Sequence, residues 1–561
     1  MPVLLCVAAG LALSTLPFAL WWSRLGSWIY IADDDNLYYL QLAAQAYYNH
    51  AWYISDPAYA RAFPSAFPAV EFVPAVIAAG VAGLGPFSIN MIWHLWAGIA
   101  AALGTYFIFW RGLKTRWAAA FCAILLLSDS DHRWAEPVAR QLITFVQVFR
   151  GSDAFRNNLE FDQFRVVHPG LLFPLVLIQV GLLSMGRERP SWLRILLSGA
   201  VFGAVFYDSF YFWTAIALGL AIAFVLDRGH RSVYMHTAWI GGLIGLPSIV
   251  QGISLRRLAV GLPRTSLFLH VPRTCCLILP KAAILLLLIS GLWIWFRRRS
   301  DLLYIWSLAL AGMLLTNHQV VSGLELHNTH WTYFWGPLLS ITVIVLAASE
   351  LLPHVRWTPL SRAVSVGVLC AYFALGMYLR AVAVADSHPT TLMQQHYVRY
   401  QAQRLNGSAR PLAPNSMIAG DESFCDLAVV GDNQHPLSGY AVLQSPTTSD
   451  AEWKTRVALN GYLKGASRSE FLGQVTDFTG SYTWGPWSMG EVPMSALIDD
   501  LMHQYDVVVQ DPSQFIDRYN VRFVALPATQ ATPTYLESGW TLIQSGPSWR
   551  IWEKEGHVDA G

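Results

Sequence analysis

Apolar segments recur along the first two-thirds of this 561-residue chain, and they constrain its fold more than any other feature of the sequence. They lie near 2–21, 87–110, 117–128, 170–185, 192–206, 210–226, 234–250, 275–296, 302–316, 333–349 and 363–383. The chain is 54% hydrophobic and only 13% charged, whereas soluble domains carry about 25% charged residues. These properties predict a polytopic α-helical membrane protein with about eleven spans.

Basic clusters separate alternate apolar segments and predict how the chain is oriented. They are Arg111, Lys114 and Arg116; Arg187 and Arg189; Arg228 and Arg231; Arg297, Arg298 and Arg299; Arg356 and Arg362. The positive-inside rule places these clusters in the cytoplasm. A membrane domain over 1–383 then has outer loops at 22–86, 129–169, 251–274 and 317–332.

Segment 67–85 leaves two topologies open. It is fairly apolar, but it contains Glu71, Pro68 and Pro74, and its uninterrupted apolar run is only about 14 residues long. Such a length favours a short helix pair that dips into the membrane, with Asp33–Asp35 outside. A true span at this point would instead give twelve spans and place the three aspartates in the cytoplasm.

The composition becomes polar near residue 385. Strand-like runs occur at Tyr440–Leu443, Asp506–Gln510, Val521–Leu526 and Trp549–Trp552, and helical patterns at Asp450–Leu463 and Met494–Tyr505. This mixture predicts a soluble α/β domain over 384–561 on the outer side of the membrane. The net charge of +1 argues against a nucleic-acid partner.

Three consecutive aspartates, Asp33, Asp34 and Asp35, follow the first apolar segment. A carboxylate in hydrocarbon costs about 2.5–3.5 kcal/mol even on a lenient scale, so the run lies in water at the membrane face. The residues after it have nearly helical spacing, and the helix dipole favours carboxylates at a helix start. The run is therefore either an acidic helix cap or a group that accepts a proton or holds a metal.

Other polar candidates lie in outer loops close to the ends of spans. They are Asp129 and Asp131, Arg165 and His168, Arg264, and His318, His327 and His330. Carboxylates suit deprotonation of a hydroxyl or binding of Mg²⁺ or Mn²⁺, although an Asp-x-Asp pair after a helix is also typical of a solvated turn. Arginine and histidine suit a phosphate leaving group. Both groups are needed for glycosyl transfer from a polyprenyl-phosphate-linked sugar at a membrane face.

The chain resembles the GT-C superfamily of integral membrane glycosyltransferases, which includes the oligosaccharyltransferase catalytic subunit, the protein mannosyltransferases and the lipid A aminoarabinose transferases. The run Asp34-Asp35-Asn36-Leu37-Tyr38-Tyr39-Leu40 is similar to their acidic and aromatic first-loop motif. Asp129-Ser130-Asp131 is similar to a second acidic motif, and 84–90 with the span that ends at 110–114 resembles their second-span region. The resemblance covers about 1–383.

The resemblance implies roles for particular residues. An outer-face aspartate, Asp34 or Asp35, is expected to be the catalytic base. The residues expected to hold the lipid phosphate are Arg165, His168, Arg264, His327 and His330. If the reaction uses a metal, Mg or Mn, its expected ligands are Asp35, Asp129 and Asp131.

The sequence leaves alternatives open for the acceptor and for the class of function. The Trp-Trp-Asp motif that the oligosaccharyltransferase group uses to bind its acceptor does not occur in the C-terminal region, so a glycan, lipid or protein acceptor stays open. A transporter or flippase of lipid-linked glycans would carry ionisable residues at mid-membrane depth, with Asp208 and Lys281 as its main candidates. A glycan polymerase shares the donor chemistry. Under each of these hypotheses we expect a multi-pass protein of a bacterial inner membrane, in contact with membrane lipids.

Overall fold

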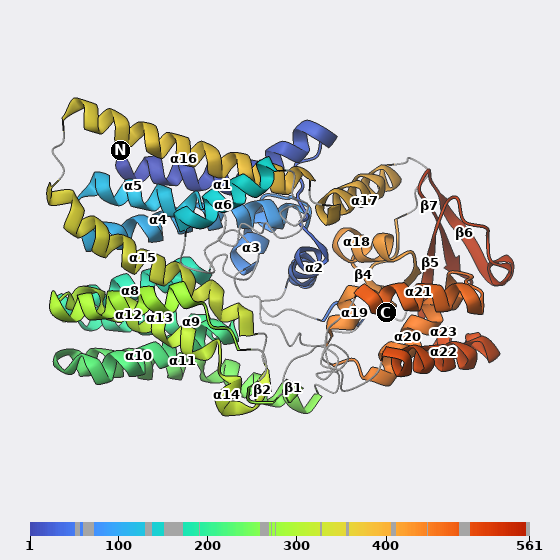
Figure 1. Ribbon diagram of the computed structural model, residues 1–561. Helices are drawn as coiled ribbons and strands as arrows, with labels where there is room; N and C mark the ends of the chain where they lie inside the picture. Colours follow the sequence, from blue (N-terminus) through green and yellow to red (C-terminus); the bar gives the residue numbers. More distant parts are fainter. Residues whose placement is uncertain are drawn as a thin grey trace. The chain divides into compact units, whose positions relative to one another are not determined.

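The computed structural model of the chain describes residues 1–50, 56–59, 72–129, 137–150, 172–189, 191–258, 269–270, 272–274, 277–325, 328–354, 358–386, 388–405, 411–445, 447–481 and 494–556 (Figure 1). The chain forms two compact units. The first comprises Met1–Tyr30, Met91–Gln251 and Val271–Thr391. The second comprises Ile31–Asn90, Gly252–His270 and Leu392–Gly561, so the first outer loop belongs to the same unit as the C-terminal region. The predicted domain division at 383/384 stays a prediction.

The first unit is built of helices. They are α1 (Pro2–Leu25), α4 (Ser88–Leu113), α5 (Arg116–Leu127), α6 (Pro137–Phe149), α8 (Leu172–Glu188), α9 (Trp192–Val205), α10 (Phe210–Leu226), η3 (Arg228–His230), α11 (Arg231–Leu258), α12 (Lys281–Phe296), α13 (Ser300–Leu315), α14 (Gln319–Ser322), η4 (Asn328–Trp331), α15 (Thr332–Leu351), η5 (Leu352–His354) and α16 (Pro359–Asp386), with the short strand β2 (Leu324–Glu325). Helix α17 (His388–Arg404) leads into the second unit.

Each predicted apolar segment coincides, in its described part, with one of these helices. Among the described residues, the helices long and apolar enough to cross a membrane are Pro2–Leu25, Ser88–Leu113, Arg228–Ser254, Thr332–His354 and Pro359–Ala385. The other apolar helices are shorter than the roughly 20 residues that a perpendicular span needs. The chain is therefore an integral membrane protein, and the predicted count of about eleven spans is not confirmed.

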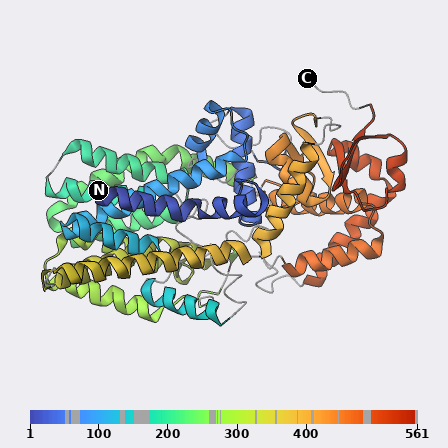
Figure 2. The same cartoon turned by 90° about the horizontal axis from the view of Figure 1, so that it is seen from above.

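Small residues allow helices of the first unit to pack backbone to backbone. A Cβ atom on Gly10 of α1 would lie 2.4 Å from the carbonyl oxygen of Gly98 in α4, so only glycine fits at this crossing. Helix α1 also lies beside α5 and α16, and both views show α1 and α16 side by side (Figures 1 and 2). Close contact through small residues is the usual way in which helices associate in lipid.

Segment 67–85 contains helix α3 (Val73–Val81), which has nine residues. At about 1.5 Å per residue this helix is roughly 14 Å long, about half of the hydrocarbon thickness. Residues 67–71 lie outside the described residues. The described part thus holds one short helix, and both predicted topologies, the dipping helix pair and the true span, stay predictions.

The second unit combines helices with a five-stranded sheet. Its elements are α2 (Asp34–Asn49), α3, β1 (Leu269–His270), β3 (Ser416–Gly420), α18 (Glu422–Asp432), β4 (Gln434–Pro436), α19 (Tyr440–Gln444), α20 (Asp450–Leu463), α21 (Arg468–Ser481), α22 (Met494–Gln510), α23 (Pro512–Arg518), β5 (Val521–Pro527), η6 (Thr534–Glu537), β6 (Trp540–Ser545) and β7 (Trp549–Lys554).

The order of strands in this sheet is β4-β3-β5-β7-β6. Strand β3 pairs parallel with both β4 and β5, whereas β7 pairs antiparallel with β5 and β6. Helix α18 connects β3 to β4, and α19 to α23 connect β4 to β5. All five residues of β3 are buried, as expected for a central parallel strand. The predicted α/β class of the C-terminal region is confirmed.

Two of the predicted strands are wrong. Val521–Leu526 and Trp549–Trp552 lie in β5 and β7, but Tyr440–Leu443 forms helix α19 and Asp506–Gln510 forms the last part of α22. The predicted helix Asp450–Leu463 matches α20.

The reason for the second error is the spacing of the buried residues of α22. Leu497, Leu501, Tyr505 and Val508 are buried at intervals of three or four residues, so one apolar helix face continues through the β-branched run. Packing of this face overrides the strand preference of three successive valines.

Candidate functional site

The acidic run forms the start of helix α2. Asp33 is the residue that caps the helix: its backbone is extended, and its carboxylate accepts a hydrogen bond of 2.8 Å from the backbone N–H of Asn36. Asp34 and Asp35 are the first two residues of the helix itself. The predicted cap and the predicted candidate base are therefore different aspartates of one run.

Helix α2 is fixed to helix α18 of its own unit by polar contacts. The Gln41 amide donates to the backbone carbonyl of Asp426 at 3.0 Å, and the Tyr48 hydroxyl donates to the backbone carbonyl of Val430 at 2.8 Å. Val430 lies in the last turn of α18, where carbonyl groups have no partner within the helix. The acidic run therefore begins a helix whose position is set by the α/β unit.

The predicted outside location of α2 can be tested by labelling a cysteine with a membrane-impermeant thiol reagent in intact cells. Asn36 is buried and suits this poorly, whereas Asn49 is exposed at the other end of the helix. With the exposed native Cys370 replaced, Asn49→Cys should react without permeabilisation. Gly229→Cys, which lies in a basic cluster predicted to be cytoplasmic, should react only after the cells are permeabilised. Labelling of position 49 only after permeabilisation would support twelve spans.

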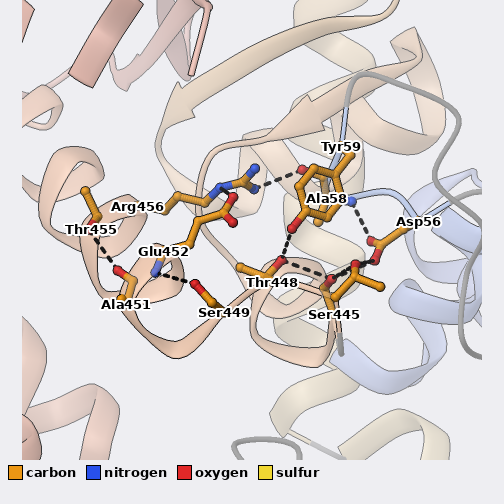
Figure 3. Close-up of polar contacts among 11 residues, drawn as sticks. Asp56, Ala58, Tyr59, Ser445, Thr448, Ser449, Ala451, Glu452, Thr455 and Arg456 are labelled. Atoms are coloured by element: carbon orange, nitrogen blue, oxygen red, sulfur yellow. Dashed lines mark hydrogen bonds and ion pairs between the residues drawn. The ribbon is translucent and has the colours of Figure 1, made fainter. Parts of the chain in front are cut away.

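Asp56, also in the first loop, is buried in the second unit (Figure 3). Its carboxylate accepts hydrogen bonds from the Ser445 hydroxyl at 2.6 Å, the Thr447 hydroxyl at 3.1 Å and the backbone N–H of Ala58 at 2.9 Å. Burial raises the pKa of Asp56, against the lowering effect of these three donors and of Arg456. Asp56 thus has structural partners on a distant part of the chain.

His435 of β4 contacts the same segment. Its Nδ1 donates to the backbone carbonyl of Pro57 at 3.0 Å, and its Nε2 lies 2.8 Å from the side-chain amide of Asn415. Burial lowers the pKa of His435 to about 4, so the ring is neutral at pH 7.

We expect His435 to destabilise the fold in acid. In the unfolded chain the pKa of His435 is near 6.5, so between pH 6.5 and 4 the unfolded chain binds a proton at His435 that the folded chain does not bind. The free energy of unfolding therefore falls by up to about 3 kcal/mol as the pH falls from 6.5 to 4. Gln in place of His435 keeps a donor for Pro57 but does not titrate. Melting temperatures of the two full-length proteins in detergent, at pH 7.5 and 4.5, should diverge. The raised pKa of Asp56 has the opposite effect on stability in acid, but Asp56 is present in both proteins and its effect cancels in the comparison. If the melting temperatures of the two proteins depended equally on pH, this expectation would be contradicted.

Asp129 lies at the end of α5 in the first unit and is fully buried. A Cβ atom on Gly376 of α16 would lie 2.2 Å from the carbonyl oxygen of Ser128, so α16 passes directly over this helix end. Asp129 is therefore not part of a solvated turn. Asp131, its predicted companion, lies outside the described residues.

Of the predicted phosphate-binding residues, the structure describes His330. Its ring lies 4.6 Å, between centroids, from the ring of Tyr211 in α10, within the first unit. The nearby His318 donates from Nδ1 to the backbone carbonyl of Leu315, and burial lowers its pKa, so it is uncharged at pH 7. The predicted residues outside the described ranges are Arg165, His168, Arg264 and His327.

The metal prediction concerns Asp35, Asp129 and Asp131. Within the described ranges, no group of three or more His, Cys, Asp or Glu side chains lies close enough together to hold a metal ion. Only Asp129 of the three has a described side chain. The metal therefore stays a prediction.

A cavity of about 390 Å³ lies in the first unit at the ends of helices that carry predicted cytoplasmic clusters. Arg111 and Glu188 line it and pair at 2.6 Å, and Arg187 lines it and pairs with Asp227 at 2.5 Å. Arg111, Glu188 and Arg187 are thus already engaged in ion pairs, although the partner of Arg187 does not itself line the cavity. It lies beside the end of α4, whereas Asp129 follows the far end of α5.

Sequence reasoning missed several polar residues. Arg380 is 3% exposed in α16, one helical turn beyond Gly376. An arginine inside a predicted apolar span is itself a signal of function and could have been selected. Ser445, His435 and Arg456 gave no such signal, because no local pattern pairs them with the first loop.

Comparison with known proteins places the fold. No protein-family model and no curated protein sequence matches the chain. Solved structures do match, among them the crystal structure of ArnT from Cupriavidus metallidurans bound to undecaprenyl phosphate, with a TM-score of 0.52, 12% identity, and 98% of this chain and 97% of that chain covered. The apo crystal structure of the same protein has a TM-score of 0.49 and 13% identity over the same shares. The chain therefore has the fold of ArnT, a membrane glycosyltransferase of the GT-C superfamily, as the resemblance in its sequence predicts.

Proposed function

We propose that the chain is a glycosyltransferase that moves a sugar from a polyprenyl-phosphate-linked donor to an acceptor at the outer face of a bacterial inner membrane. The observation that carries this proposal is the likeness to the ArnT structure bound to undecaprenyl phosphate, which extends over 98% of the chain. The acidic run in the first loop supports it, since this run is similar to the acidic and aromatic first-loop motif of the family that the sequence resembles.

The proposed base is Asp34 or Asp35 at the start of α2. The base takes the proton of the acceptor hydroxyl, whose oxygen attacks the anomeric carbon of the donor sugar. The bond from this carbon to the phosphate oxygen breaks with inversion, and polyprenyl phosphate leaves. A helix N-terminus keeps a carboxylate ionised at neutral pH, as a base requires.

The leaving phosphate gains negative charge as its bond to the sugar breaks. Cationic or hydrogen-bonding groups around it stabilise that charge in the transition state. The residues proposed for this role are Arg165, His168, Arg264, His327 and His330. If a divalent cation takes part, Asp35, Asp129 and Asp131 are its proposed ligands, and the cation would offset the same charge.

A transporter is supported less well. Asp208 lies in the short connection between α9 and α10, and Lys281 is the first residue of α12 and is exposed. Both lie at helix ends, whereas a transported substrate is usually bound by ionisable residues near mid-membrane depth. These positions favour the enzyme.

The test is transfer by the purified full-length protein in lipid nanodiscs. Synthetic polyprenyl-phosphate sugars, both hexoses and pentoses, are offered with a membrane extract as the source of acceptors. We expect at least one donor to be converted to polyprenyl phosphate, only when the protein is present. Parallel reactions with a chelator, and with Mg²⁺ or Mn²⁺ added back, show whether sugar transfer requires a divalent cation. Consumption of no donor in the panel would reject the proposal.

A further inference from the structure

Residues 56–59 of the first loop are inserted into the α/β unit. The backbone N–H of Tyr59 bonds to the Asp56 carbonyl at 3.3 Å, which closes a turn with Pro57 at its second position. Ala58 at the tip of this turn is fully buried and belongs to the same hydrophobic core as Leu437 and Trp453. The turn is thus part of the core of a domain that the chain forms more than 300 residues later.

The polar groups of this turn are matched by groups of the α/β unit (Figure 3). The pairs are Asp56 with Ser445 and Thr447, the Pro57 carbonyl with His435, the Ala58 carbonyl with Arg456 at 2.9 Å, and the Tyr59 hydroxyl with Thr448 at 2.9 Å. Buried polar groups without partners are costly, so removal of one partner penalises the inserted state. The contacts fix both the position and the direction of the turn.

Arg456 of α20 holds the turn from inside the unit. Its side chain is 2% exposed, and its guanidinium lies 5.0 Å from the ring of Tyr59 and 5.3 Å from the ring of Tyr519. Its Nε lies 3.2 Å from the Glu452 carboxylate. A buried cation is costly without partners, and here an ion pair, two aromatic rings and a carbonyl acceptor surround the guanidinium.

The turn follows directly on the acidic helix. Residues 50–55 alone separate it from the end of α2. Helix α2 is bonded to α18 of the same unit through Gln41 and Tyr48. The acidic helix is therefore held at two places by the α/β unit, once along its length and once just beyond its C-terminal end.

We propose that residues 56–59, together with Ser445, His435 and Arg456, form a clamp through which the α/β unit holds helix α2 in its catalytic position. Asp56 and Arg456 are then positioning residues for sugar transfer, and this assignment rests on the proposed function. A base displaced by about 1 Å costs roughly 100-fold in rate, so release of the clamp acts on the chemical step.

The experiment compares full-length variants in nanodiscs. Asp56→Ala and Arg456→Gln open the clamp, and Asp56→Asn keeps its size and one acceptor oxygen. Asp506→Asn, which removes an exposed carboxylate from the same unit, is the matched control. For each protein we measure hydrogen exchange of peptides from α2 and from the helices of the first unit. In parallel we measure kcat and KM for the polyprenyl-phosphate donor.

We expect faster exchange in α2 but not in the first unit, and a fall in kcat of about 10- to 100-fold with KM little changed, in both clamp variants. Asp56→Asn should restore much of both, and Asp506→Asn should match the wild type. Unchanged exchange in α2, or faster exchange with unchanged kcat, would overturn the clamp's role. If the wild type transfers no sugar, the proposed function fails, and the exchange data still decide whether the clamp holds α2. If Asp56→Ala does not fold, Arg456→Gln and Asp56→Asn carry the comparison.

Discussion

Asn in place of Asp34 or Asp35 is expected to lower sugar transfer by about 10²–10⁴-fold in at least one of the two variants, which is the usual cost of losing a general base. The change keeps the size of the side chain and removes its negative charge. The melting temperature should stay close to that of the wild type, because asparagine has the same size as aspartate and the carboxylate that caps helix α2 belongs to Asp33. Initial rates with a synthetic polyprenyl-phosphate sugar measure the effect. Near-wild-type rates in both variants would show that the first loop does not supply the base.

Asp33 supplies a matched control within the same run. Its carboxylate caps α2 by accepting from Asn36, and Asn is an equally good cap. Asp33→Asn should therefore keep both transfer and stability, whereas Asp33→Ala should lose about 1 kcal/mol with transfer kept. Arg165→Ala and His168→Ala should instead weaken donor binding, since these residues are proposed to hold phosphate.

Gly420→Ala should unfold or strongly destabilise the α/β unit. Gly420 ends β3 with a φ of +113°, and an added Cβ would lie 1.9 Å from the carbonyl oxygen of Ala525 in the neighbouring strand. Its N–H and carbonyl are both bonded to the Asn460 side chain, at 2.7 and 3.1 Å, so the backbone cannot shift without breaking these bonds. Backbone strain and overpacking together cost about 2–6 kcal/mol.

Gly473→Ala is the control for this substitution. Gly473 lies in α21 with open space around the position of its Cβ, so alanine should stabilise the helix by about 0.5–1 kcal/mol. Thermal unfolding of both full-length variants, followed by tryptophan fluorescence, gives the comparison. A Gly420→Ala protein that melts at the wild-type temperature would contradict the packing at the end of β3.

The helices of the membrane part could be predicted because hydrocarbon imposes a simple rule on sequence. A helix in lipid needs a long apolar run, and each predicted run proved to be a helix. The number that cross the membrane could not be read in the same way. Helices such as α5, with 12 residues, are apolar without being long enough to span on length alone.

The sheet of the second unit was predicted only in part. Its strands β5 and β7 have apolar, β-branched or aromatic runs, whereas β3 and β4 are short and contain Gly420 and Pro436, which are typical of turns. Helix α19 is a single short turn, and it forms a helix rather than a strand because its side chains are buried against other elements. Local propensity is weak where packing against other elements sets the structure.

The candidate site was predicted as a run of residues but not as a geometry. The family resemblance already selected Asp34 and Asp35 from the three aspartates, and the structure adds that Asp33 caps the helix. The partners of Asp56 could not be predicted at all, because Ser445 lies 389 positions further along the chain. Pairing over such a distance depends on the whole fold and leaves no trace in local spacing.

The fate of a doubly labelled donor tests the central claim most directly. Full-length protein in proteoliposomes receives a polyprenyl-phosphate sugar labelled separately in the sugar and in the phosphate, together with the membrane acceptor extract. A glycosyltransferase should separate the labels, with free polyprenyl phosphate and acceptor-bound sugar appearing in equal amounts, and the Asp34→Asn, Asp35→Asn double variant should leave them together. Both labels remaining in one intact lipid that only changes leaflet would contradict the account and identify a flippase.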